Sequence, residues 1–297
     1  MLNGGTAWVG KRYYSRPDIH MIDMQYINTN GTGAGLGKIP AGPGKFSYAF
    51  FKDNDINIVD AAGKVDTTAA RRQNLIYGDI PVNGNGTIDV AASIITAQGI
   101  DKPGSDKHDG WQLSVFHKQV KLWGEENTIG VQYGVGPGVG TESGRIGPSG
   151  STLLGSDASR RRFFDHLWIQ PVWNFGMEFI ALVQRDKSDA TGSSIWSSIG
   201  ARPVFALSRN LKVALELGAD RVTAPNEKAQ RLTKITLAPS ISAGPGLWSR
   251  PELQAFVTYG KWNDAARAAV NASNNSGPVY NNGNSGTSFG FQVENSF

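Results

Sequence analysis

The chain has 297 residues, no cysteine and a formal net charge of +4. The lack of cysteine excludes disulfides, thiol catalysis and cysteine-ligated metals, and so small a basic balance without a recognisable motif argues against a nucleic-acid partner. No apolar run reaches the length of a transmembrane helix, about 18 residues, whereas a transmembrane barrel stays possible because its alternating strands average out as polar.

The first informative stretch is Gly10–Asn28, which combines charges of both signs with aromatic rings. Its ionisable donors and acceptors are Lys11, Arg12, Arg16, Asp18, His20 and Asp23. Pro17 interrupts regular pairing, so the charged part is predicted to be a loop between two strands. Asp18 and His20 are two residues apart and would share one side of an extended backbone. Such fixed charges are costly to bury, and a water-filled constriction suits them.

The rest of the chain reads as short strands joined by links that are alternately tight and long. Asn83-Gly84-Asn85-Gly86 is a strong hairpin signal, and the glycine-rich segments Gly31–Gly37 and Gly42–Lys45 read as turns. Long links are predicted at 53–70, 98–108, 136–158 and 263–286. The pattern gives about fourteen strands. Tight links on one side and long links on the other are typical of outer-membrane barrels.

Within the predicted strands, apolar and polar residues alternate. Ile88, Val90, Ala92 and Ile94 share one face, as do Ile235, Leu237 and Ile241. Period two with one apolar face indicates a half-buried strand. The opposite face is often small and polar, as in a wall that lines water, although a soluble antiparallel sheet remains an alternative. The chain ends on Phe297, and a terminal aromatic is similar to the assembly signal of outer-membrane barrels.

Three groups of residues could carry other chemistry. Asp18 and Asp23 could form the carboxylate pair of a glycosidase, but nothing indicates the desolvation that would raise one pKa. Asp18, His20 and Asp23 lack a second histidine for a metal site. No catalytic or metal residue is therefore predicted. Arg160-Arg161-Arg162 reads as a solvated rim, with contact to lipopolysaccharide phosphates as the sharper hypothesis.

The Gly10–Asn28 stretch resembles the inward-folded third loop of the maltoporin and sucrose-porin family. The matching residues are Trp8, Gly10-Lys11-Arg12, Tyr13-Tyr14, Ser15, Arg16 and Asp18-Ile19-His20-Met21-Ile22-Asp23. The resemblance continues at Asp109-Gly110-Trp111, Ala201-Arg202-Pro203, Lys234–Ala238, Trp248-Ser249-Arg250-Pro251 and Tyr259-Gly260-Lys261-Trp262. It therefore spans essentially the whole chain.

The resemblance implies an all-β, transmembrane antiparallel β-barrel in which residues 11–25 form the inward-folded constriction loop. Of the roughly 18 strands of the family barrel, about 14 would be present, so residues 1–297 are expected to be a single porin barrel domain lacking the N-terminal strands and the signal peptide. The expected location is the outer membrane of a Gram-negative bacterium. The expected partners are oligosaccharides, outer-membrane lipid, lipopolysaccharide and two further copies in a homotrimer.

The resemblance also implies a function, which is facilitated passive diffusion of maltodextrin- or sucrose-type sugars without a cofactor. The implied sugar-binding and constriction residues are Lys11, Arg12, Arg16, Asp18, His20, Asp23, Gln25 and Trp248. A lone tryptophan at a turn is often an interfacial anchor, but the family places the aromatic of the Trp248 motif in a lane along the channel. Gln25 stands where maltoporins have tyrosine, so a broader sugar range is expected. A general diffusion porin and a soluble carbohydrate-binding β protein are the alternatives.

Overall fold

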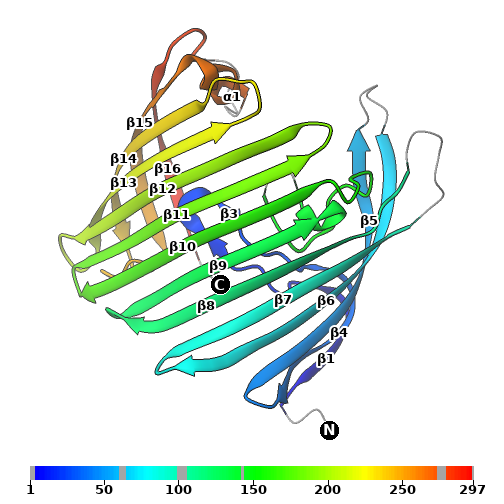
Figure 1. Ribbon diagram of the computed structural model, residues 1–297. Coiled ribbons are helices and arrows are strands. Elements are labelled where there is room, and N and C mark those ends of the chain that lie inside the picture. The colour runs from blue at the N-terminus through cyan, green and yellow to red at the C-terminus, as the bar shows by residue number, and fades with distance from the viewer. Residues whose placement is uncertain (1–3, 60–64, 99–105, 142–143, 273–278, 296–297) are drawn as a thin grey trace. The chain divides into compact units, whose positions relative to one another are not determined.

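A computed structural model of the chain describes residues 4–59, 65–98, 106–141, 144–272 and 279–295. Within these residues, fourteen strands form one sheet in the order β1, β4 and then β5 to β16 (Figure 1). The prediction of an antiparallel all-β fold with about fourteen strands is confirmed. The strands are β1 (Thr6–Arg12), β4 (Gly31–Ala41), β5 (Gly44–Val59), β6 (Val65–Asn83), β7 (Gly86–Gln98), β8 (Gly110–Leu122), β9 (Glu125–Val135), β10 (Ser159–Val172), β11 (Phe175–Ser188), β12 (Gly192–Ala206), β13 (Leu211–Thr223), β14 (Gln230–Ser242), β15 (Glu252–Trp262) and β16 (Ser285–Glu294).

The chain divides into two compact units. The first unit comprises Met1–Gln119, Thr128–Phe163 and Arg185–Ser193. The second unit comprises Val120–Asn127, Phe164–Gln184 and Ser194–Phe297. No helix in the described part of the chain has the length and apolar character needed to cross a membrane.

Side chains alternate along the strands, and the buried face is the polar one. In β8, Gln112 and Ser114 are 1% and 0% exposed, whereas Trp111 and Leu113 are both 44% exposed. We call the face with Gln112 the inner face and the face with Trp111 the outer face. A soluble sheet buries its apolar face, so this reversed pattern is the one that a membrane barrel wall requires.

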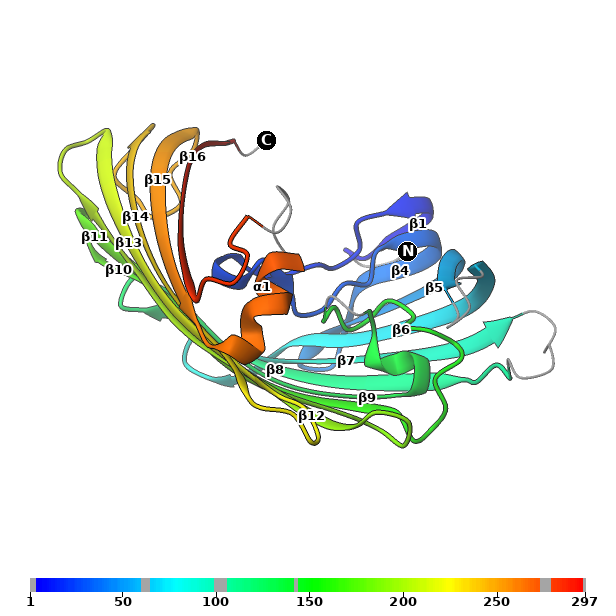
Figure 2. The ribbon, with the colours of Figure 1, turned by 90° about the horizontal axis from the view of Figure 1, so that it is seen from above.

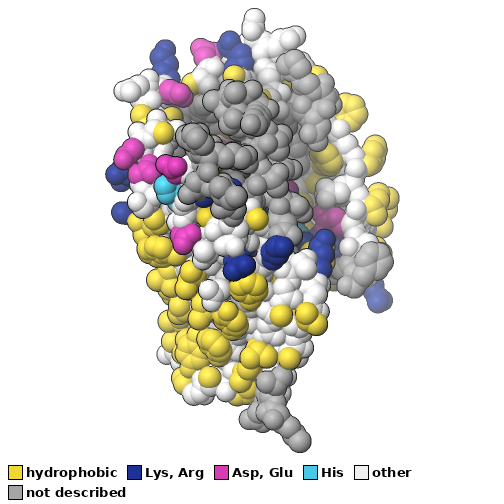
Figure 3. Space-filling model, turned by 90° about the vertical axis from the view of Figure 1, so that its right-hand side faces the viewer, with side chains coloured by type: hydrophobic (Ala, Val, Ile, Leu, Met, Phe, Trp, Pro, Cys, Tyr) yellow, Lys and Arg dark blue, Asp and Glu magenta, His cyan; other side chains and the backbone are white. Residues whose placement is uncertain are grey.

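The same alternation holds in the second unit. In β14, Ile235, Leu237 and Ile241 are exposed on the outer face, while Ser240 and Ser242 are buried on the inner face. The faces predicted from the sequence are therefore confirmed in this strand. In the view of Figure 3, hydrophobic side chains gather in a field at the lower left, and most charged side chains lie above or beside this field.

The predicted turn at Gly31–Gly37 is wrong, because these glycines lie inside β4. A Cβ atom added at Gly35 would lie 2.5 Å from the Tyr48 carbonyl oxygen and 2.9 Å from Trp8 Nε1. Glycine is present because a neighbouring strand and an indole ring approach closely, and not because the backbone turns. The turn comes later, at Gly42 and Pro43 between β4 and β5, as the sequence predicted.

Short and long links alternate from β4 to β11. Two residues join β6 to β7 (Gly84 and Asn85), β8 to β9 (Trp123 and Gly124) and β10 to β11 (Trp173 and Asn174), and the long link 136–158 lies between β9 and β10. Beyond β11 the difference in length is lost, because the link 189–191 is shorter than 207–210 and the link 224–229 is shorter than 243–251. In outer-membrane barrels the short links are periplasmic and the longer ones external, which orients each strand.

Two predicted links differ from the structure. The link expected at 53–70 is mostly strand, because β5 continues to Val59 and pairs there with Val65 of β6; residues 60–64 lie outside the described part. The link expected at 263–286 contains a 3-10 turn, η3 (Asp264–Ala266), and a short helix, α1 (Arg267–Ala272). Most of the link expected at 98–108, namely residues 99–105, and the terminal Phe297 also lie outside the described residues.

Candidate functional site

Residues Asp18–Gln25 form a small hairpin in the first unit, which we call the charged hairpin. Its strands β2 (Asp18–Ile19) and β3 (Met24–Gln25) pair Asp18 with Gln25 and Ile19 with Met24. A 3-10 turn, η1 (His20–Ile22), joins them. Asp23 closes the turn in the left-handed conformation, with φ of 47°, and its N–H donates to the His20 carbonyl.

The charged side chains of this region are exposed. Lys11 and Arg12 end β1 and so precede the hairpin, and the Arg12 guanidinium lies 5.5 Å from the centre of the Trp8 ring. Arg16 stacks over Tyr13 at 4.7 Å. The residues with exposed side chains are Lys11, Arg12, Arg16, Asp18, His20 and Asp23. They offer donors and acceptors to water or to a solute.

Three of the predicted site residues contact neighbours within the region. The Asp18 carboxylate and His20 Nε2 lie 4.0 Å apart, with both side chains about half exposed. The Gln25 Oε1 atom accepts a hydrogen bond of 2.6 Å from Asn28 Nδ2. The amide of Gln25 is therefore held by the segment that follows the hairpin.

The opposite side of the hairpin is apolar and buried. Ile19 and Met24 form its central pair and are 0% and 3% exposed. Tyr26 and Ile27, which follow directly, are also buried. The hairpin thus presents its charges to solvent while an apolar side fixes it to the protein.

A buried polar cluster on the inner face of the first unit holds the base of the hairpin. Gln132 of β9 donates from Nε2 to the Tyr26 carbonyl (2.8 Å) and to Ser114 Oγ (3.0 Å). Its Oε1 accepts from Arg162 Nη1 at 3.0 Å. The Tyr26 ring packs on Phe116, another inner-face residue, with centroids 5.1 Å apart. We call Ser114, Gln132 and Arg162 the polar hub.

The link between β9 and β10 forms the second anchor of the hairpin segment. Ile27 forms a parallel bridge with Ile146, whose carbonyl accepts from the Asn28 N–H at 2.8 Å. Figure 2 shows the hairpin segment and this link on the same side of β7 to β9. Because the hub residues line that side, the hairpin lies over the inner face of the first unit.

The three consecutive arginines are not a solvated rim, and that prediction is wrong for two of them. Arg160 is buried and donates to Asp186 (2.7 Å) and to the Val139 carbonyl (2.9 Å). Arg162 is buried in the polar hub, and only Arg161 is exposed on the outer face. Side chains alternate along β10, so Arg160 and Arg162 both point to the inner face. There, both donate to carbonyls of the link between β9 and β10.

An aromatic cluster lies beside the start of the hairpin segment. The rings of Trp8, Tyr14 and Phe51 are mutually within 6 Å, since their centroid distances are 5.6, 5.5 and 5.9 Å. The Tyr14 hydroxyl donates to the Leu36 carbonyl at 3.2 Å. Burial raises the pKa of the Tyr14 phenol above its ordinary value, so the hydroxyl stays a neutral donor.

Trp248 lies in the second unit, on the link 243–251 between β14 and β15. Its ring meets that of Trp168, an inner-face residue of β10, edge to face with centroids 5.8 Å apart. The link is fixed by the Leu247 N–H, which donates to Gln170 Oε1 (2.8 Å), and by Lys212 Nζ, which donates to the Gly246 carbonyl (3.1 Å). The tryptophan pair is therefore rigidly placed on the inner face.

Comparison with known protein families shows which family the chain belongs to. The family model described as LamB porin matches residues 1–295. The chain belongs to the LamB porin family. The expected relationship to maltoporins is thereby confirmed at the level of the family. LamB porins are outer-membrane channels through which sugars diffuse; they are not enzymes, and they bind oligosaccharides and form oligomers.

This LamB porin carries a second charged group, on the inner face of its second unit. Glu178 is fully buried, and its two oxygens contact His166 Nε2 (3.0 Å) and Arg202 Nη1 (3.3 Å). Arg202 also donates from Nε to Glu216 at 2.7 Å and keeps about a quarter of its side chain exposed. This group gives the wall a fixed, partly accessible cation.

Several residues of these porin sites were not identified from the sequence. Alternation along the strand places Trp168, Gln132 and Glu178 on the inner face. No other local feature of the sequence identifies these three residues. Their partners come from other strands, so their roles depend on pairing that one strand does not encode. In the part of the chain that the structure describes, no group of three metal-ligating side chains is assembled.

Proposed function

We propose that this porin is a sugar-selective channel for maltodextrin- or sucrose-type oligosaccharides, with residues 11–25 as the constriction loop. The observation that carries the proposal is the two-sided charged hairpin. Its apolar side and the polar hub fix it over the inner face, while its charges stay exposed. Donors and acceptors held in place in this way can exchange hydrogen bonds with the hydroxyl groups of a sugar.

The proposed mechanism is exchange of hydrogen bonds as the sugar sheds water. Arg16 and, from the end of β1, Lys11 and Arg12 supply donors to hydroxyl oxygens. Asp18 and Asp23 accept from hydroxyls, and His20 does either. Each contact must be weak enough to release the sugar, because transport is passive and needs no cofactor.

The aromatic pair of the second unit supports the same substrate class. Sugar rings have apolar faces that lie well on an aromatic ring, and Trp248 is held in place by Trp168 and by the bonds of its link. We propose that Trp248 provides such a platform. We also propose the homotrimer of the family as the assembled state, in contact with outer-membrane lipid and lipopolysaccharide.

Neutralising the charged loop is expected to abolish most sugar binding. The test variant combines Arg16→Gln, Asp18→Asn and Asp23→Asn. A matched control, Asp189→Asn with Glu227→Gln and Lys228→Gln, makes the same charge changes at exposed positions in links. Sugar block of ion current should fall by about tenfold or more in the first protein and stay unchanged in the second. Equal block in all three proteins would show that the sugar binds away from this loop, and no block in the unaltered chain would leave a general diffusion porin.

Replacing Gln25 with tyrosine is expected to shift selectivity towards maltodextrins. Gln25 has no rigid ring, and its amide is already held by Asn28, so it leaves room for disaccharides with bulkier linkages. Gln25→Tyr should give a modest gain in block by maltohexaose and a loss of sucrose flux, measured by current block and liposome swelling. If neither sugar responds, Gln25 does not set the substrate range.

A further inference from the structure

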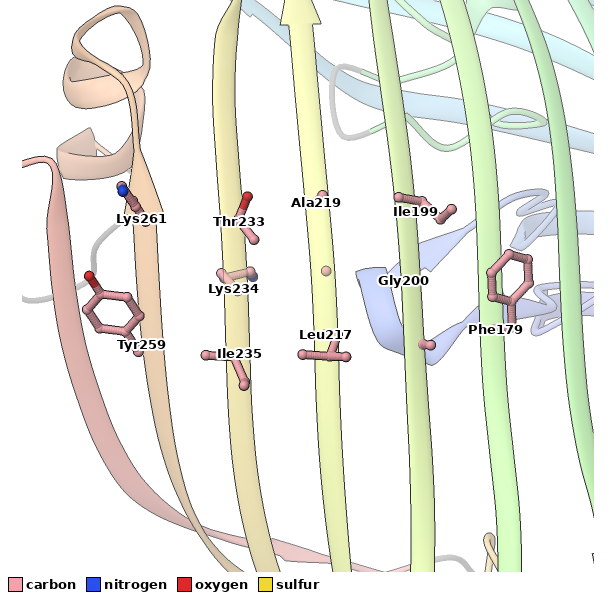
Figure 4. Close-up of a pocket in the computed structure, with 12 residues that line it drawn as sticks. Phe179, Ile199, Gly200, Leu217, Ala219, Thr233, Lys234, Ile235, Tyr259 and Lys261 are labelled. Atoms are coloured by element: carbon pink, nitrogen blue, oxygen red, sulfur yellow. The ribbon is translucent and has the colours of Figure 1, made fainter.

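A groove lies on the outer face of the second unit, across β11 to β15. It has a volume of about 630 Å³, and its walls include Phe179, Ile199, Leu217, Ile235 and Tyr259 (Figure 4). The groove exists because Ala219 and Thr233, which face each other across β13 and β14, are smaller than their neighbours. Its lining is almost wholly apolar, as an acyl chain would require.

Three cations border the end of this groove. Arg221 lies directly opposite Arg231, one step along the outer face from the Ala219–Thr233 pair. Lys261 of β15 lies opposite Thr233. All three side chains are exposed, and both arginines line an adjoining hollow of about 380 Å³. Like charges placed directly opposite across two strands destabilise a sheet unless something offsets them.

The protein does not supply the compensating charge among its described residues. No ion pair found in that part of the chain includes Arg221, Arg231 or Lys261. The adjacent Asp220 is on the inner face, where its Oδ1 accepts from Trp196 Nε1 at 3.0 Å. An external anion is therefore the natural partner of the arginine pair.

The position of the three cations along their strands indicates which kind of anion they bind. β13 follows the tight link 207–210 and leads to the link 224–229, so Arg221 is near the external end of its strand. The apolar groove lies deeper, towards Leu217, Ile235 and Tyr259. Phosphate over an acyl chain is the order found in a phosphorylated lipid of the outer leaflet, and arginine binds phosphate in a bidentate geometry.

We propose that this face binds a phosphorylated outer-leaflet lipid of the lipid A type. Its phosphates contact Arg221, Arg231 and Lys261, and one acyl chain occupies the groove. This lipid site is independent of the sugar path, because it lies on the outer face. It rests on the outer-membrane location that the LamB family provides.

The arginine pair is tested by titrating diphosphorylated lipid A into the delipidated full chain in mild detergent and counting bound lipid by native mass spectrometry. Arg221→Gln with Arg231→Gln should weaken binding by about tenfold or more. The control, Lys121→Gln with Arg209→Gln, removes two exposed cations near tight links and should change binding less than about twofold. Equal binding by both double variants would overturn the proposal.

A second set of measurements separates the lipid from other occupants. Thr233→Trp fills the groove and should weaken lipid binding although the arginines remain, while excess inorganic phosphate should not displace the lipid. Lipid A without phosphates should bind as poorly as the double arginine variant. The proposal fails if dephosphorylated lipid binds equally well, if free phosphate displaces the lipid, or if Thr233→Trp instead dissociates oligomers without altering lipid binding. Unchanged sugar block in each variant verifies that the protein is folded.

Discussion

Gln132→Leu is expected to raise ion conductance, remove sugar block and destabilise the protein by about 1–3 kcal/mol. Leucine has nearly the volume of glutamine but none of its polar atoms. The change removes the hydrogen bond of Gln132 to the Tyr26 carbonyl and the Gln132 oxygen that accepts from the buried Arg162 guanidinium. The base of the charged hairpin would lose its bond to the wall, so the hairpin should leave the channel path part of the time.

Gln112→Leu provides the matched control for this prediction. Gln112 is equally buried, donates to Ser93 Oγ at 2.9 Å and accepts from the hub residue Ser114 at 2.7 Å, but no hydrogen bond found among the described residues joins it to the hairpin segment. It should lower the free energy of unfolding, measured by urea titration in detergent, while leaving conductance and sugar block near their original values. If Gln132→Leu also lowers stability without a change in current, the polar hub holds the wall and does not hold the hairpin.

Glu178→Leu is expected to cost a similar amount, about 1–3 kcal/mol. It leaves the partly buried Arg202 and the imidazole of His166 without the carboxylate between them. The double variant Glu178→Leu with Arg202→Leu should recover part of this loss, because the guanidinium that lost the Glu178 carboxylate is removed with it, while Glu216 then loses its own partner. The measurement is the coupling free energy from a double-mutant cycle of unfolding in detergent.

An exposed pair gives the comparison for that cycle. Lys45 and Asp79 are 2.9 Å apart, but both side chains are about half exposed. Removing either should cost less than about 1 kcal/mol. Additive losses at Glu178 and Arg202, with no coupling, would show that Glu178 is stabilised chiefly by other contacts.

The sequence was sufficient for those features that a single strand encodes. The period of two along β7 and β14 identified outer-face residues such as Ile94 and Ile235, because each strand separates a lipid-facing side from a polar one. The hairpin segment was found through a long family motif. Both are local signals, and neither needs knowledge of which strands are neighbours.

The errors came from features that depend on neighbouring strands. Glycines at 31–37 read as a turn, whereas they admit the Trp8 and Phe51 rings that belong to other strands. The arginines at 160–162 read as one charged rim, although strand parity already separates Arg161 from the other two. The partners of Gln132 and Glu178 depend on register and on a distant link, so no local pattern specifies them.

The reversed alternation of the wall also constrains how the family can change length. One residue added inside β10 would turn Arg162 towards the hydrocarbon and Phe163 towards the aqueous interior, together with every side chain beyond the insertion. Two added residues would restore the facing of both. Viable descendants should therefore lengthen their strands in even steps, or absorb a single residue in a bulge, whereas links such as 224–229 are free to gain or lose residues one at a time.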